Sequence, residues 1–211
     1  MPSDRQGPVA GILLAAGTSS RMGKNKLLFE LDGESVIRRA VRQALAGGLS
    51  PLIVVLGHES DKAWKEIEDL PCEWALNPLY EQGINSSLKA GVMAVRGLKA
   101  KAAMVMLADM PFVTSEMIAA MIAHYRESTA PLVISDYDGV NAPPMVYDQS
   151  LFTELLLMEG EGCGRQVVKR HKAEAEVLPW PVSALQDLDV PEDFARVSGG
   201  EKAHSSTTRR S

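Results

Sequence analysis

A short loop near the start of the chain concentrates positive charge, with Arg21, Lys24 and Lys26 close together in the sequence. The loop follows residues 9–14, a run too short and too apolar for an amphipathic helix, which predicts a buried parallel strand. Small residues such as Gly17 let the backbone pass close to a bound anion. A strand that ends in a small-residue loop with several cations is typical of a site for nucleotide phosphates.

The spacing in this loop excludes two common phosphate-binding motifs. A Walker loop reads Gly-x-x-x-x-Gly-Lys-Ser/Thr. Here five residues separate Gly17 from Gly23, and Asn25 follows Lys24. No Gly-x-Gly-x-x-Gly follows the first expected strand, so the sequence lacks the main motif that would indicate a dinucleotide-binding oxidoreductase. An ordinary strand-to-helix turn with solvated lysines remains as the alternative to a phosphate site.

Asp109 is placed where a ligand-binding carboxylate is expected. It follows residues 102–107, an apolar run that predicts a second buried strand, so it should emerge at the carboxyl end of that strand. Open α/β sheets bind ligands at this edge, and the basic loop also follows a strand. A carboxylate opposite cations in a nucleotide site commonly binds Mg²⁺, which combines carboxylates with phosphate oxygens. The alternative is a carboxylate that only stabilises the turn before Pro111.

The elements that would position these residues alternate between apolar runs and helical patterns. This alternation predicts an α/β fold with a mostly parallel central sheet flanked by helices. The expected strands are 9–14, 51–56, 72–76, 102–107, 132–135, 145–147 and 175–178, and the expected helices are 35–46, 62–70, 86–95, 114–125, 150–158 and 164–172. Residues 136–144 are expected to form a loop between two of the strands.

The 211 residues are enough for one domain, which we expect to span residues 9–197, between an N-terminal extension (1–8) and a disordered polar tail (198–211). The net charge of −5 argues against nucleic acid as a partner, because such binding rests on many Lys and Arg contacts with phosphate. Cys72 and Cys163 match no metal-ligand spacing, which favours a reducing compartment. Neither a signal peptide nor a membrane span is recognisable, so we expect a cytoplasmic protein without a membrane partner.

The basic loop resembles the signature loop of the molybdenum cofactor nucleotidyltransferases, a group of MobA-like NTP transferases, over Leu14-Ala-Ala-Gly-Thr-Ser-Ser-Arg-Met-Gly-Lys-Asn-Lys-Leu27. Within that family, the Ala-Ala-Gly form resembles the cytidylyltransferase branch, because the guanylyltransferases usually carry a second glycine where Ala16 stands. The resemblance continues, in the family's order, through residues 77–91, 107–111 and 187–194.

The resemblance implies a single Rossmann-like domain of the GT-A-like nucleotidyltransferase kind. It also implies Mg²⁺-dependent transfer of CMP from CTP to the phosphate of molybdopterin, with release of pyrophosphate. A phosphate monoester is mostly dianionic at neutral pH, so the nucleophile needs no general base. The implied partners are a nucleoside triphosphate, a molybdopterin-type acceptor and a client molybdenum hydroxylase.

The charges suggest a role for each catalytic residue. Arg21 should clamp the β and γ phosphates in fork geometry, Lys26 should reach the α phosphate, and Asp109 should bind Mg²⁺. The resemblance, through residues 187–194, implies a second metal carboxylate at Asp189, with Asp187 in reserve, although the same motif is also an ordinary helix start. The resemblance implies a nucleotide-binding set of Leu14, Ala15, Ala16, Gly17, Arg21, Lys26, Asn77, Gly83 and Ser87.

Asn77 and Arg165 each have an alternative interpretation, and residues 142–146 depart from the family's pattern. Asn77 with Pro78 is equally a plain turn signal. Residues 142–146 depart from the Gly-His-Pro that cofactor cytidylyltransferases often show at this place, and only Pro144 matches. Arg165 is either a ligand of the acceptor phosphate or an early helix residue.

Three other functions fit part of the pattern. One is guanylyl or other nucleotidyl transfer to a different phosphorylated acceptor. Another is a non-catalytic carrier or chaperone that binds the molybdenum cofactor and delivers it to an apoenzyme. The joint presence of the expected cations and metal carboxylates favours catalysis, because a carrier has little use for a complete metal and triphosphate site. A sugar-phosphate nucleotidyltransferase would show a different opening loop and usually a longer chain.

Overall fold

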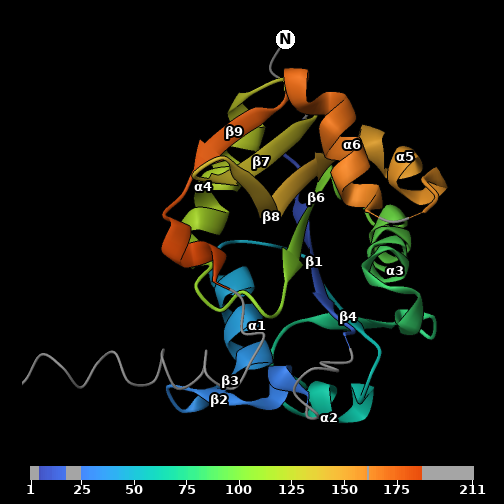
Figure 1. Cartoon of the computed structure of the whole chain (residues 1–211), viewed down its shortest axis with the longest axis vertical. Helices are drawn as coiled ribbons and strands as arrows, with labels where there is room; N and C mark the ends of the chain where they lie inside the picture. Colours follow the sequence, from blue (N-terminus) through green and yellow to red (C-terminus); the bar gives the residue numbers. More distant parts are fainter. Residues whose placement is uncertain (1–4, 18–24, 161, 187–211) are drawn as a thin grey trace, which may run out of the picture.

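In the computed structural model, one sheet of seven strands has the order β5-β4-β1-β6-β8-β7-β9 (Figure 1). The strands are β1 (Val9–Ala15), β4 (Leu52–Leu56), β5 (Glu73–Leu76), β6 (Ala102–Leu107), β7 (Leu132–Tyr137), β8 (Val140–Asp148) and β9 (Glu176–Pro179). Neighbouring strands are parallel except in the two pairs that β8 makes, with β6 and with β7. The mostly parallel sheet expected from the sequence is confirmed.

The structure describes residues 5–17, 25–160 and 162–186. Several residues expected in the site lie outside these described residues, namely Arg21, Lys24, Asp187 and Asp189. The expected tail after residue 197 lies outside them as well, and these expectations stay predictions. Along the described ranges, no helix has both the length and the hydropathy needed to cross a bilayer.

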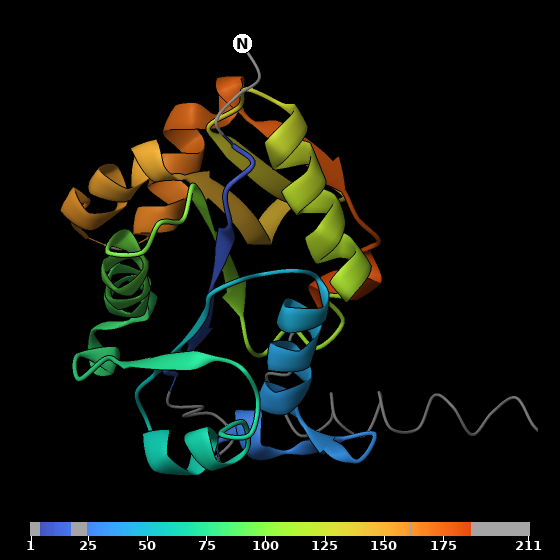
Figure 2. The same ribbon diagram turned by 180° about the vertical axis from the view of Figure 1, so that it is seen from behind.

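Helices cover both faces of the sheet. On one face lie α1 (Val36–Ala46) and α4 (Ser115–Glu127), and on the other α3 (Ile84–Arg96), α5 (Phe152–Leu157) and α6 (Cys163–His171). The view from behind in Figure 2 shows the same separation. Two apolar cores result, and β1 contributes to both because successive side chains of a strand point to opposite faces.

Capping side chains explain where the two helices of the first face begin. Ser35 Oγ accepts a hydrogen bond from the backbone N–H of Arg38 at the start of α1. Thr114 Oγ1 accepts one from the backbone N–H of Met117 at the start of α4, so both helices begin at a hydroxyl residue that caps them. Strands β1 and β4 are buried throughout, as expected for central parallel strands with near-continuous apolar runs.

The prediction of a loop at 136–144 is wrong, because most of these residues belong to a β-hairpin of β7 and β8. Asp138 and Gly139 form the tight turn, with φ angles of 55° and 88°. Such two-residue turns match the twist of the strands they join. Pro143 and Pro144 are unusual inside a strand, because proline has no backbone N–H to donate to a neighbouring strand. However, β8 pairs with β6 only beyond these prolines, so no hydrogen bond to β6 is lost there.

Other boundaries differ less. The helix predicted at 62–70 starts earlier and is shorter, as α2 (Ser60–Lys65), and turns follow it. The helix predicted at 150–158 opens with a 3-10 turn before α5. A short hairpin of β2 (Glu30–Leu31) and β3 (Glu34–Ser35) has no counterpart among the predicted elements, because strands of two residues carry no recognisable period.

Arg5 anchors the residues just before β1 to the segment that follows α4. Its guanidinium donates hydrogen bonds to the carbonyl oxygens of Ser128, Thr129 and Ala130, at 3.0, 3.0 and 2.8 Å, just beyond the end of α4. It also lies over the ring of Tyr125, 4.8 Å from the ring centroid. Carbonyl groups at a helix end lack intrahelical partners, so a cation there satisfies them and complements the helix dipole.

Replacing Arg5 with alanine should lower the free energy of unfolding by about 2 kcal/mol, because charged hydrogen bonds and a cation–π contact are lost together. Urea denaturation of the full chain would show this as a lower transition midpoint with an unchanged slope. Arg96→Ala is a matched control, since Arg96 is exposed at the end of α3. Equal midpoints for the two variants would contradict the anchoring role.

Candidate functional site

The carboxyl ends of β1 and β6 meet at the centre of the sheet. Leu14 pairs with Leu107, and the backbone N–H of Ala108 donates to the carbonyl oxygen of Leu14 over 3.1 Å. From β1 the sheet continues to β4 on one side and to β6 on the other, so the strand order reverses here, as at the ligand-binding edge of open α/β sheets. Both strands point toward the same end of the molecule (Figure 1). The start of the basic loop and Asp109 therefore lie at one edge, as the sequence predicts.

The structure joins two of the predicted catalytic residues directly. Lys26 Nζ lies 2.7 Å from Asp109 Oδ2, and the two side chains are only 13% and 23% exposed. Lys26 begins the 3-10 turn η1 (Lys26–Leu28), in which the side chain of buried Asn25 accepts a hydrogen bond from the backbone N–H of Leu27. With little water around them, the two charges interact more strongly than at an open surface. The pair offers a cation and a carboxylate to the same ligand.

The residues at the end of β1 differ in what they offer to a nucleotide. Leu14, Ala15 and Ala16 are buried, so any contact with a ligand would be made by their backbone. Gly17 is exposed, and a Cβ atom built there would meet nothing within 4 Å. Packing of the described residues therefore does not require glycine at position 17. Its close approach to a ligand, like the contacts of the three residues before it, stays a prediction.

Asn77, Gly83 and Ser87 form a second group, around the carboxyl end of β5. Asn77 Nδ2 donates to Ser86 Oγ at 2.8 Å and to Ser87 Oγ at 3.0 Å. Asn77 Oδ1 accepts from the backbone N–H of Leu79, and Asn77 and Ser87 are only 3% and 5% exposed. Gly83, with a φ of 91°, directly precedes α3. We call Asn77, Ser86 and Ser87 the polar knot, because their hydrogen bonds connect the end of β5 to α3. Contacts of Asn77, Gly83 and Ser87 with a nucleotide stay a prediction.

Asp109, the carboxylate beside Lys26 at this edge of the sheet, suits Mg²⁺. In the part of the chain that the structure describes, no three or more His, Cys, Asp or Glu side chains are grouped to hold a metal ion. Mg²⁺ is usually bound by few carboxylates, together with substrate phosphates and water. Asp109 therefore fits a metal ion held mainly by phosphate oxygens. Asp189, the predicted second ligand, lies outside the described residues.

The residues after β4 also reach this edge, although they are absent from the predicted site. The backbone N–H of His58 donates to the carbonyl oxygen of Ala16 over 3.4 Å. Glu59 adopts a left-handed conformation with a φ of 50°, and a hydrogen bond from Lys62 lowers the pKa of its carboxyl group. Such a conformation is uncommon outside glycine and is frequent at functional sites. The signal in the sequence is Gly57-His-Glu directly after an apolar run. Asp109 is predicted as a metal ligand from the same kind of placement.

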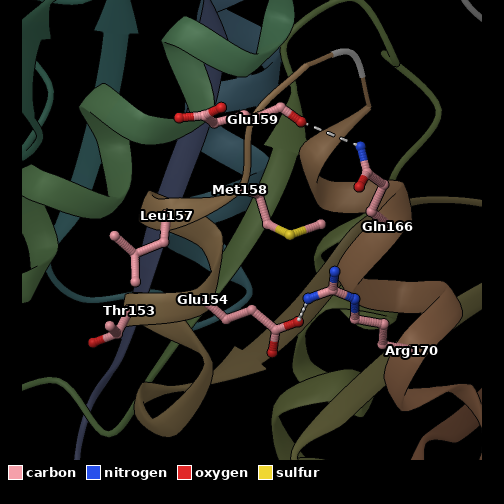
Figure 3. Close-up of a pocket in the computed structure, with 7 residues that line it drawn as sticks. All are labelled: Thr153, Glu154, Leu157, Met158, Glu159, Gln166 and Arg170. Atoms are coloured by element: carbon pink, nitrogen blue, oxygen red, sulfur yellow. Dashed lines mark hydrogen bonds and ion pairs between the residues drawn. The ribbon is translucent and has the colours of Figure 1, made fainter.

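A separate groove of about 620 Å³ lies beside α5 and α6 (Figure 3). Glu154 of α5 pairs there with His171 at 2.7 Å and with Arg170 at 3.0 Å, and these hydrogen bonds lower the pKa of its carboxyl group. Arg165 is exposed in the first turn of α6 and does not line the groove. Lys26 and Asp109 do not line it either, so the groove is distinct from the sheet edge at the ends of β1 and β6.

Comparison with known proteins identifies related sequences. A family model described as the MobA-like NTP transferase domain matches residues 11–175. The purine catabolism protein PucB of Bacillus subtilis (strain 168) is 28% identical over 198 residues, which cover 89% of this chain and 94% of PucB. A probable molybdenum cofactor guanylyltransferase of Opitutus terrae is 32% identical over 199 residues, covering 89% of this chain and 94% of that protein.

Solved structures share the fold. Rv0371c of Mycobacterium tuberculosis superposes with a TM-score of 0.78 at 21% sequence identity, covering 92% of this chain and 98% of Rv0371c. A structure of Rv0371c in complex with manganese gives a TM-score of 0.75 at 20% identity, covering 91% of this chain and 98% of that one. At these identities the likeness establishes the architecture, and the single α/β domain expected from the sequence is confirmed.

Proposed function

Since the chain belongs to the MobA-like NTP transferase family and is a nucleotidyltransferase, we propose that it transfers CMP from CTP to the phosphate of molybdopterin and releases pyrophosphate. The observation that carries this proposal is the pair of Lys26 and Asp109, 2.7 Å apart at the edge where the strand order reverses. A cation next to a metal-binding carboxylate is what the triphosphate of a nucleotide requires. The relative from Opitutus terrae, named for the molybdenum cofactor, supports the acceptor.

The reaction forms a bond between an oxygen of the acceptor phosphate and the α phosphorus, and it breaks the bond from that phosphorus to pyrophosphate. The acceptor phosphate is mostly dianionic at neutral pH, so no side chain has to remove a proton. Lys26 would stabilise the negative charge that shifts onto the α phosphate, and Arg21 would hold the β and γ phosphates. Catalysis would then rest on positioning and charge, as is usual in phosphoryl transfer.

Asp109, together with Asp189, would hold Mg²⁺. When bound, this ion would neutralise part of the phosphate charge. The low exposure of Asp109 and its place at the end of β6 support this role. Rv0371c, which shares the fold, has been solved with manganese, and this supports a divalent cation in general.

GTP is the second candidate for the nucleotide. Ala16, where guanylyltransferases usually carry glycine, favours CTP. The 32% identical relative is itself named a probable guanylyltransferase, which favours GTP. The proposed client is a molybdenum hydroxylase, and the proposed location is the cytoplasm, where nucleoside triphosphates are available.

Pyrophosphate release tests this function. The purified protein would be supplied with Mg²⁺ and molybdenum cofactor, in parallel with CTP, GTP, ATP or UTP, and Asp109→Ala would serve as the control. We expect release with CTP, and its loss in the variant. Release with GTP alone would assign the guanylyl reaction instead. Binding of the cofactor without release from any nucleotide would indicate a carrier.

A further inference from the structure

Three segments from different parts of the chain meet at Gly57, at the carboxyl end of β4. A Cβ atom added to Gly57 would lie 2.7 Å from Tyr80 Cβ and 2.9 Å from Ala16 Cβ, closer than real contacts allow. Gly57 is not among the glycines with positive φ, so space rather than backbone geometry requires it. The missing side chain lets Tyr80 pack against the end of β4, beside Ala16.

The polar knot holds Tyr80 in place. Tyr80 begins the 3-10 turn η2 (Tyr80–Gln82). Both backbone polar groups of the residue before it, Leu79, are hydrogen-bonded. The backbone N–H of Leu79 donates to Asn77 Oδ1 at 3.0 Å, and its carbonyl oxygen accepts from Ser86 Oγ at 2.8 Å. The side chain of Tyr80 nevertheless remains partly exposed. A partly exposed ring on a turn fixed in this way is suited to contact a ligand.

His58 extends this aromatic surface. Its ring centroid lies 6.0 Å from that of Tyr80, with the ring planes inclined by 53°. The His58 side chain is 37% exposed, and its backbone N–H is bonded to the carbonyl oxygen of Ala16. We call Gly57, His58 and Tyr80 the aromatic wall.

The aromatic wall and the Lys26–Asp109 pair lie on opposite sides of the end of β1. The strand order is β4-β1-β6, and neighbouring strands are about 4.8 Å apart, so the ends of β4 and β6 are separated by about 10 Å. The charged pair is at the β6 side and the two aromatic rings are at the β4 side. A nucleotide whose α phosphate lies at Lys26 can cross the end of β1 and bring its base to the wall.

We infer that the aromatic wall is the surface on which the nucleobase stacks, with Tyr80 as the stacking ring and Gly57 as the residue that makes room for it. This inference rests on the proposed nucleotidyl transfer. It gives Asn77 a positioning role, because both of its amide hydrogens are used within the polar knot that holds the turn of Tyr80. Stacking of a base on an aromatic ring is sequence-tolerant, so the wall contributes affinity for a nucleoside rather than choice among bases.

The test compares binding of CTP with binding of inorganic tripolyphosphate, which has the phosphates but no base. Calorimetry would be used on the full chain in the presence of Mg²⁺. Tyr80→Ala should weaken CTP about tenfold and leave tripolyphosphate unchanged, since only the base contact is lost. Tyr80→Phe keeps the ring and should bind CTP like the unsubstituted protein. Gly57→Ala should weaken CTP as well, because its Cβ atom displaces Tyr80.

Trp74→Ala is the matched control, because Trp74 is an aromatic residue of β5 that is 45% exposed and does not belong to the wall. It should leave both affinities unchanged. Unaltered CTP binding by Tyr80→Ala would overturn the inference, and so would equal weakening of CTP and tripolyphosphate, which would indicate a displaced loop. If the unsubstituted protein binds neither ligand, the proposed nucleotidyl transfer itself fails, and the wall with it.

Discussion

Pyrophosphate release by Asp109→Asn should fall about a thousandfold below that of the unsubstituted protein, which corresponds to about 4 kcal/mol of lost transition-state stabilisation. The substitution keeps the shape of the side chain and removes its charge. Two consequences follow: the proposed Mg²⁺ loses its carboxylate, and Lys26, only 13% exposed, loses the partner that lies 2.7 Å away. Initial rates at saturating CTP and acceptor would measure the effect.

The control is Asp138→Asn, the same chemical change in the turn between β7 and β8. Asp138 is exposed and has a φ of 55°, a conformation that asparagine also tolerates. It should retain the full rate. A rate for Asp109→Asn close to that of the control would mean that Asp109 only stabilises the turn before Pro111. Thermal denaturation of both variants would show that the loss comes from chemistry and not from unfolding.

The placement of Asp109 at the edge of the sheet where β1 also ends was predictable because it depends on a general rule. Buried parallel strands appear in the sequence as apolar runs, and β1 and β6 are buried along almost their whole length. The residues that follow such strands gather at one edge of the sheet. Strand type and strand direction were therefore sufficient, without any knowledge of side-chain contacts.

The hairpin of β7 and β8 shows where local sequence was misleading. Pro143 and Pro144 disfavour a strand in isolation, but the partner strand β6 does not extend beside them. Whether a proline is tolerated depends on which neighbours the rest of the sheet supplies, and that is a tertiary property. The turn at Asp138 and Gly139 carries a recognisable hairpin signal, and it would have been the better guide.

In the site as well, the sequence indicates which residue types are present but not which contacts they make. The resemblance places Asn77 in the nucleotide site, but the sequence does not reveal that both of its amide hydrogens are used by serines of α3. The contact between Gly57 and Tyr80 cannot be read from the sequence for a similar reason. The glycine is needed only because a ring from a later segment packs against it, at 2.7 Å from the Cβ position. Such requirements exist only once the chain has folded.

Lys26→Met should slow pyrophosphate release several hundredfold and, at the same time, tighten the binding of Mn²⁺ measured without nucleotide. A charge pair at about 4 Å and an effective dielectric near 20 contributes about 4 kcal/mol before desolvation, which sets the scale of the loss in rate. The gain in metal affinity has the opposite sign, because the ammonium group 2.7 Å from Asp109 Oδ2 repels a second cation and occupies that oxygen.

The opposite signs separate Lys26 from Asp109, whose replacement should weaken both the rate and the binding of Mn²⁺. Lys169→Met is the control for loss of a lysine, since Lys169 is exposed on α6, and it should change neither quantity. If Lys26→Met lowered the rate and the affinity for Mn²⁺ together, Lys26 would be a structural support of the site rather than a ligand of the α phosphate. In the double variant the two losses in rate should not add, because two residues in direct contact act as one unit.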